Sequence, residues 1–172
     1  NAFAGCANLT SVTFESITTN AQMTIGKGAF QESGLTSISI PSKVAVVEQE
    51  AFADCAALAS VTIEESDSPL TIGSLDQNVD GYHPFYNSNN ITSLRLNREL
   101  VKAHGDVSMK LFEGKTKLAY LELGENVQTI YGNMFNEIGI AQLTIPGTVT
   151  CIKENAFSNC HSLTYVKFLQ NK

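Results

Sequence analysis

Phenylalanine recurs along this chain at repeating intervals, and this recurrence limits the folds open to the chain. Five or six residues after each of these phenylalanines a short pattern begins. It consists of Leu or Ile, two further residues, an apolar residue, one further residue and a second apolar residue. From each phenylalanine to the last apolar residue of its pattern the count is 10 or 11 residues. The seven phenylalanines are Phe3, Phe30, Phe52, Phe85, Phe112, Phe135 and Phe157. Such regular spacing indicates a chain of structural repeats.

The interval from each pattern to the next phenylalanine varies from 12 to 22 residues. Insertions are therefore expected on one side of the structure. The apolar pattern predicts a turn followed by a short strand whose last two apolar residues point inward. Seven such strands predict a parallel sheet. Apolar pairs such as Val44 and Val47 before the next phenylalanine predict a second extended segment, and no helix of ordinary length is expected.

The repeat from Ile145 to Phe168 carries the clearest version of the unit, I-P-x-x-V-x-x-I-x-x-x-A-F-x-x-C-x-x-L-x-x-V-x-I. The matching residues are Ile145, Pro146, Val149, Ile152, Ala156, Phe157, Cys160, Leu163, Val166 and Phe168. This unit resembles the BspA-like class of leucine-rich repeats, found in bacterial surface proteins and in some parasitic protists. The resemblance implies a non-enzymatic repeat solenoid of about seven repeats, mostly parallel strands and turns with little helix. It also implies a secreted or surface-anchored protein that adheres to a protein partner, such as an extracellular-matrix or neighbouring-cell protein.

Composition bounds the size and the partners of the chain. With 172 residues, 43% of them hydrophobic, residues 1–172 are expected to form a single repeat array. A net charge of −6 argues against nucleic acid as a partner, and no apolar run is long enough to cross a membrane. The chain opens in the middle of a repeat and shows no capping sequence, so we expect it to be part of a longer protein.

The cysteines show little sign of disulfide or catalytic chemistry. Cys6, Cys55 and Cys160 each stand three residues after a phenylalanine. They are thus predicted to be buried thiols at one position of the first, third and seventh repeats, too far apart to pair. Cys160 and His161 are adjacent, but neighbouring residues of a turn point in different directions, so a nucleophile with its base is not expected. We therefore predict no catalytic residue and no cofactor.

One polar segment imitates a metal-binding loop. Residues 76–81, Asp-Gln-Asn-Val-Asp-Gly, copy the first six positions of a calcium loop, but its twelfth position is Asn87 rather than Glu. Asp, Asn and Gly also favour plain turns. Turn chemistry is the favoured interpretation, and no metal ligand is assigned.

The residues between the inward positions should form columns on the outer face of the sheet. In the first three repeats these columns contain Ser and Thr, whereas the later repeats place larger side chains there. Tyr and Arg are enriched at binding hot spots. The candidate protein-binding residues are Arg95, Tyr120, Glu122, Tyr165 and Lys167. Two alternatives remain: a structural spacer that binds nothing, and a carbohydrate-binding module whose tyrosines stack on sugar rings.

Overall fold

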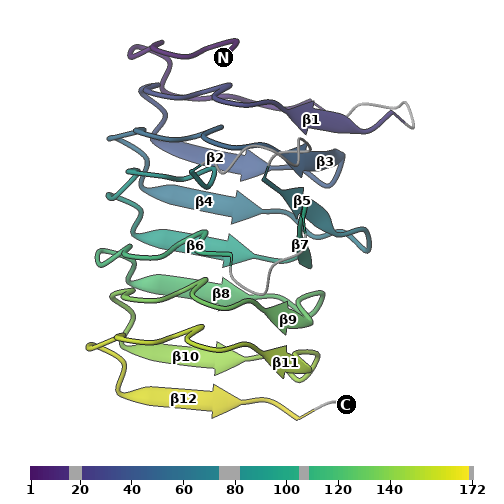
Figure 1. Ribbon diagram of the computed structural model, residues 1–172, viewed down its shortest axis with the longest axis vertical. Coiled ribbons are helices and arrows are strands. Elements are labelled where there is room, and N and C mark those ends of the chain that lie inside the picture. The colour runs from purple at the N-terminus through teal and green to yellow at the C-terminus, as the bar shows by residue number, and fades with distance from the viewer. Residues whose placement is uncertain (16–20, 74–81, 105–108, 171–172) are drawn as a thin grey trace.

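The chain winds into a stack of similar coils (Figure 1). The computed structural model describes residues 1–15, 21–73, 82–104 and 109–170. Within these ranges the chain forms twelve strands and no helix. Most coils carry one strand directly after the phenylalanine turn and a second, shorter strand on the return path. The predicted repeat solenoid is confirmed.

Six strands follow the phenylalanine turns and lie on one side of the stack. They are β2 (Ser37–Ile40), β4 (Ser60–Ile63), β6 (Ser93–Leu96), β8 (Tyr120–Leu123), β10 (Gln142–Ile145) and β12 (Tyr165–Phe168). We call their outward side the strand face. All pairings among them are parallel, as predicted. The prediction of one seven-stranded sheet is wrong: β2, β4, β6 and β8 form one sheet, β10 and β12 form another, and residues 9–14 are not a strand.

Six further strands, of two to four residues, lie on the return path. They are β1 (Met23–Ile25), β3 (Val44–Val47), β5 (Leu70–Ile72), β7 (Leu100–Lys102), β9 (Thr129–Ile130) and β11 (Cys151–Ile152). β1, β3, β5 and β7 form a parallel sheet, and β9 pairs with β11 separately. Both sides of the stack are thus divided once, after β8 on the strand face and after β7 on the return path.

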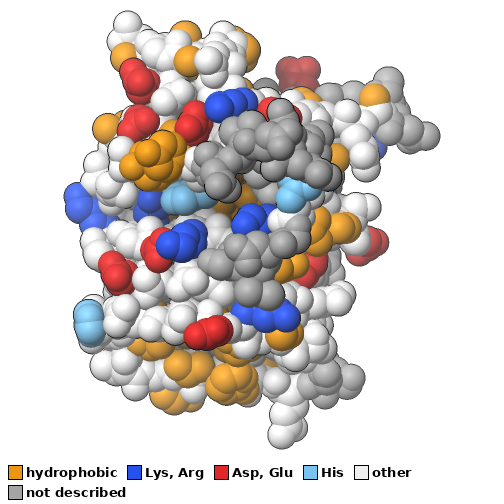
Figure 2. Space-filling view, viewed as in Figure 1, with side chains coloured by type: hydrophobic (Ala, Val, Ile, Leu, Met, Phe, Trp, Pro, Cys, Tyr) orange, Lys and Arg blue, Asp and Glu red, His pale blue; other side chains and the backbone are white. Residues whose placement is uncertain are grey.

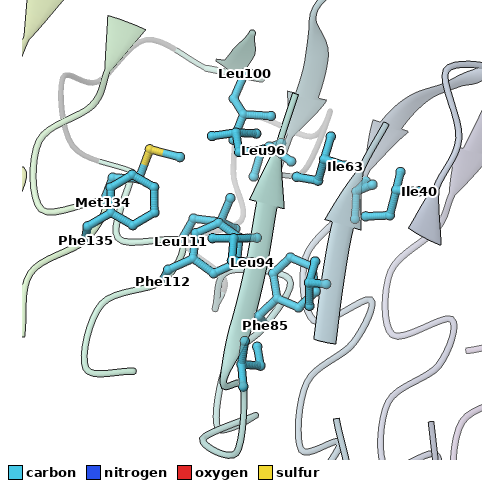
Figure 3. Close-up of a cluster of buried hydrophobic side chains, with 14 of the residues drawn as sticks. Ile40, Ile63, Phe85, Leu94, Leu96, Leu100, Leu111, Phe112, Met134 and Phe135 are labelled. Carbon is cyan, nitrogen blue, oxygen red and sulfur yellow. The ribbon is translucent and has the colours of Figure 1, made fainter. Parts of the chain in front are cut away.

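The recurring phenylalanines form the centre of the core. All seven rings stack in chain order, and neighbouring centroids lie 5.2 to 5.8 Å apart. Figure 3 shows Phe85, Phe112 and Phe135 in this row, beside inward side chains of the strands. Each fully buried ring contributes about 1.5–3 kcal/mol through loss of contact with water. A coil is therefore stabilised mainly by the coils on either side of it.

A backbone feature repeats with the rings. We call the seven stacked phenylalanines the phenylalanine ladder. The second residue after each of them has a positive φ, between 55° and 72°. Two of these residues are glycines, Gly5 and Gly114, and the others are Glu, Asp or Asn. Asn and Asp tolerate this left-handed conformation better than most residues. The same sharp turn therefore follows the phenylalanine in every coil and sets the start of the next strand.

The two ends of the stack differ from its middle in exposure. Phe3 in the first coil is 48% exposed and Phe168 in the last is 66% exposed, whereas the ladder rings from Phe52 to Phe135 are fully buried. Figure 2 shows apolar side chains gathered at the end formed by β12 and charges of both signs over the middle coils. None of the described segments contains a helix suited to spanning a membrane.

Candidate functional site: the strand face and its groove

The strand face carries the two columns that the spacing predicts. Ser37, Ser60, Ser93 and Tyr120 are consecutive partners in the first column of the four-stranded sheet. The second column of that sheet is Ser39, Thr62, Arg95 and Glu122. In the second sheet Gln142 pairs with Tyr165, and Thr144 pairs with Lys167. Large and charged side chains therefore lie on β6, β8 and β12, beside a Ser and Thr surface on β2 and β4.

Three of the five candidate residues are in direct contact. Arg95 Nε lies 3.3 Å from Glu122 Oε2, and its guanidinium lies over the ring of Tyr120, 5.7 Å from the centroid. The Tyr120 hydroxyl donates a hydrogen bond to Glu122 Oε2. These contacts hold the three side chains in one arrangement although all of them reach solvent. Such ordering lowers the entropy that a partner must remove on binding.

The division between β8 and β10 coincides with a shorter repeat. The interval from Phe135 to the last strand residue, Ile145, is ten residues. The same interval is eleven residues in the four coils whose strand pairs with the strand before it. The shorter turn brings Gly139 against the preceding turn, where a Cβ would lie 2.0 Å from the carbonyl oxygen of Thr116. Only glycine fits there. Repeat two has the same ten-residue spacing, and Gly34 makes the same approach to Ala7.

A proline removes one further backbone hydrogen bond at this junction. In the paired coils, the residue after the strand donates its N–H to the last carbonyl of the preceding strand, as from Asn97 to Ile63 at 3.1 Å and from Gly124 to Leu96 at 2.8 Å. Pro146 occupies this position after β10, and proline has no N–H. Pro41 stands at the corresponding place after β2. Both ten-residue repeats thus leave their strand unpaired with the coil before it.

A groove of about 610 Å³ opens at this division, and we call it the β8–β10 groove. Tyr120, Glu122 and Tyr165 line it, so it includes three of the predicted residues. Arg95 contacts two of these from β6, and Lys167 lies on β12 outside the lining. Leu121 points inward, and it is partly exposed where the corresponding Val61 and Leu94 are fully buried. The groove therefore reaches the apolar core.

The candidate residues that the sequence missed lie on this groove's other walls. Glu125, Gln142, Thr144 and Pro146 line it together with the apolar residues of the two strands. Their signal was present in the sequence as the shorter interval from Phe135 to Ile145 and the residues Gly139 and Pro146.

The model of the BspA type leucine-rich repeat region, in six copies, matches residues 1–79 and 81–172. The chain belongs to the BspA type leucine-rich repeat family. A leucine-rich repeat protein from Bacteroides ovatus has a similar solved structure, with a TM-score of 0.56 and 20% identity over 97% of this chain and 50% of that one. No protein with a curated description matches the chain.

A second solved structure is that of a leucine rich cell surface protein from Faecalibacterium prausnitzii. It aligns with 84% of this chain and 50% of its own at 21% identity, and its TM-score of 0.35 is too low to bear on the fold. This chain thus spans about half the length of each of the two proteins. At such identities the Bacteroides ovatus structure supports the fold alone.

The cysteines of this BspA type array have structural partners. Cys55 Sγ donates to the carbonyl of Phe30 at 3.1 Å, and Cys160 Sγ donates to that of Phe135 at 3.2 Å. Burial raises the pKa of both thiols, which disfavours the thiolate that nucleophilic chemistry requires. The prediction of buried thiols in the turns is confirmed for these two. It is wrong for Cys6, which is exposed in the first coil, where no described coil covers it.

Three basic side chains lie away from the strand face in the middle coils. Arg98 is 1% exposed, and the backbone carbonyls of Ser68, Pro69 and Val44 accept its hydrogen bonds at 2.8 to 3.1 Å. Lys115 is 2% exposed; its Nζ donates to Asn89 Oδ1, and burial lowers its pKa to about 8. Burial, with Lys115 and Lys110 nearby, lowers the pKa of His83 to about 3.

These groups do not assemble a reaction centre. The Arg98 guanidinium donates to three backbone carbonyls, and His83 is neutral near pH 7 because its pKa is so low. In the part of the chain that the structure describes, no three His, Cys, Asp or Glu side chains are grouped to hold a metal ion. The calcium-like segment 76–81 lies outside the described residues. Leucine-rich repeat arrays of this kind are generally scaffolds that bind proteins rather than enzymes.

Proposed function

We propose that this array is a non-enzymatic interaction module that binds a protein partner through its strand face. The observation that carries the proposal is the contact cluster of Arg95, Tyr120 and Glu122 beside Tyr165 at the β8–β10 groove. Tyr120 and Tyr165 are 45% and 55% exposed, and both offer a large apolar ring with a polar end. Such residues are the usual anchors of protein interfaces.

Family membership supports the rest of the proposal. The protein would be secreted or anchored at a cell surface, and its partner would be an extracellular-matrix protein or a protein of a neighbouring cell. Residues 1–172 would act as one array, because the phenylalanine ladder runs without a break from Phe3 to Phe157. Adhesion is the role that best fits an exposed, pre-ordered face without catalytic groups.

The test is binding of the array to a panel of immobilised extracellular-matrix proteins. Replacing Tyr120→Ala and Tyr165→Ala together should weaken binding by about a hundredfold, as expected for the loss of two interface anchors. The matched control replaces Ser37→Ala and Ser60→Ala, which lie in the same column on the Ser and Thr part of the face. Equal binding by both double variants would contradict the proposal, and the absence of any binding would favour a structural spacer.

A carbohydrate ligand is the second candidate, supported by the groove itself. Tyr120 and Tyr165 border it, and Gln142 and Glu122 place polar oxygens between them. Aromatic rings can stack on sugar faces while such oxygens accept hydroxyl protons. Retention on a glycan array that the Tyr120→Ala and Tyr165→Ala variant loses would favour this function over protein binding.

A further inference from the structure

The β8–β10 groove has an apolar floor that the other junctions of the strand face lack. Where β2, β4, β6 and β8 pair, the inward residues Ile38, Val61 and Leu94 are buried. At the division, Leu121 is partly exposed, and Leu121, Leu123 and Leu143 all line the groove. Leu123 and Leu143 are themselves buried, 8% and 3% exposed, so the accessible part of this floor is Leu121. Covering it gains about 25 cal/mol for each Å² removed from water.

The edges of the groove are strand edges. β8 ends the four-stranded sheet and β10 begins the two-stranded one. The sides of β8 and β10 that face each other therefore carry backbone N–H and C=O groups outside any sheet ladder. β8 and β10 still have Cα atoms within 8 Å of each other, which leaves no room for a further strand between them. A peptide would therefore reach these groups from the outer side of the groove.

The charge of the groove is one-sided. Among the residues that the structure describes, Glu122 and Glu125 line it and no Lys or Arg does. Arg95 lies outside the lining and already contacts Glu122. Glu125 is exposed on the turn after β8, at one end of the groove. A basic side chain of a ligand would therefore meet a carboxylate at that end.

We propose that the β8–β10 groove receives an extended segment of a protein, with an aliphatic or aromatic side chain on the leucine floor and a Lys or Arg beside Glu125. The inference rests on the proposed function and names the part of the partner that docks. A volume of about 610 Å³ holds a few side chains, not a folded domain. The leucine floor and the strand edges favour a peptide over a saccharide, which has neither large apolar side chains nor a strand backbone.

The experiment selects a random peptide library on the immobilised array and measures the affinity of the enriched peptide. Enriched sequences should pair an apolar residue with a nearby Lys or Arg. Ala119→Arg, at the exposed rim, should weaken binding at least about tenfold, because its long cationic side chain obstructs the groove and repels a basic ligand. Ala59→Arg is the matched control: Ala59 and Ala119 each lie seven residues after their phenylalanine, and Ala59 precedes a paired strand.

Glu125→Gln tests the charge separately. It should weaken the binding of a basic peptide about threefold at low salt. The affinity for a variant of that peptide without Lys or Arg should be unchanged. No enrichment, enrichment without basic residues, or equal affinities for the Ala119→Arg and Ala59→Arg variants would overturn the proposal. Glycan binding that Ala119→Arg abolishes would overturn it in favour of a saccharide.

The same variants separate this inference from the function it rests on. If the double tyrosine variant no longer binds a matrix protein while Ala119→Arg still binds it, the strand face binds but the groove does not receive the partner. If both variants still bind a matrix protein that the array binds, the proposed function fails as well.

Discussion

Two junctions on the strand face are built from the same repeat and behave differently. Between β4 and β6 four residue pairs are in register, and the inward Val61 and Leu94 are fully buried. Between β8 and β10 no sheet continues, and Leu121 is partly exposed. The difference is one residue in the turn, with Gly139 and Pro146 accompanying it. In this array, a shorter turn accompanies the change from a paired strand to an open groove.

The largest effect should come from truncating the inward leucine at each junction. Leu94→Ala removes a fully buried side chain from the paired junction and should lower the free energy of unfolding by about 2–5 kcal/mol. Leu121→Ala should cost less than about half as much, because Leu121 already contacts solvent in the groove. Urea denaturation of both variants makes the comparison. Equal losses would show that the groove is closed in solution.

A buried lysine in the coil that carries β8 should make the stability of the fold depend on pH. Lys115 follows Phe112 by three residues, where the preceding coils have Ser33, Cys55 and Ser88. Its folded-state pKa is lowered to about 8 from 10.5, so folding disfavours the protonated amine. The resulting penalty is fully present below pH 8 and disappears as the pH rises to 10.5. The fold should therefore gain stability across that window.

Lys115→Ser should raise the free energy of unfolding at pH 7 by about 2 kcal/mol and remove this gain above pH 8. The exposed Lys117→Ser is the matched control and should leave the pH dependence unchanged. Denaturant unfolding at several pH values measures both. A loss of stability in Lys115→Ser at pH 7 would mean that the alkyl chain and its bond to Asn89 outweigh the desolvation of the amine.

On the return path, a carboxylate replaces the missing strand pairing. β7 and β9 belong to separate sheets, and Glu99 Oε2 accepts the N–H groups of Gln128 and Thr129 at 2.7 and 3.1 Å. Glu99→Ala should therefore lower the free energy of unfolding by about 1–3 kcal/mol and speed amide exchange at both residues. The control is Glu64→Ala, because Glu64 accepts from the Ser39 hydroxyl on the exposed strand face. Unchanged exchange at residues 128 and 129 would contradict this role.

The smallest effect should follow from restoring an N–H after β10. Pro146→Asn should change the free energy of unfolding by less than about 1 kcal/mol. The shorter turn still separates the strands, so the new amide at position 146 should exchange freely. Adding one residue after Gly139 in the same variant should protect that amide and bury Leu121. Protection in the single variant would make the proline, rather than the turn length, the cause of the groove.

The sequence predicted what depends on a constant spacing. Phe52, Phe85 and Phe112 stack because their interval to the strand is fixed, and the same interval places Arg95, Tyr120 and Glu122 on one face. It did not predict the divided sheet, because the interval ending at Ile145 differs by only one residue and its effect depends on the approach of Gly139 to Thr116. Nor did it predict the burial of Lys115 and Arg98, whose types are usually exposed. Whether the candidate residues bind a partner stays a prediction.

The buried thiols can report where the array opens locally. Cys55 lies in the coil of β4 and Cys160 in the coil of β12, on opposite sides of the β8–β10 groove. Cys55 is fully buried and Cys160 is 9% exposed, and both sulfurs donate to carbonyls, so opening of its coil should speed the labelling of each thiol. The two labelling rates therefore time the opening of each part separately. Equal rates would mark one cooperative unit, and unequal rates would mark the groove as the boundary between two.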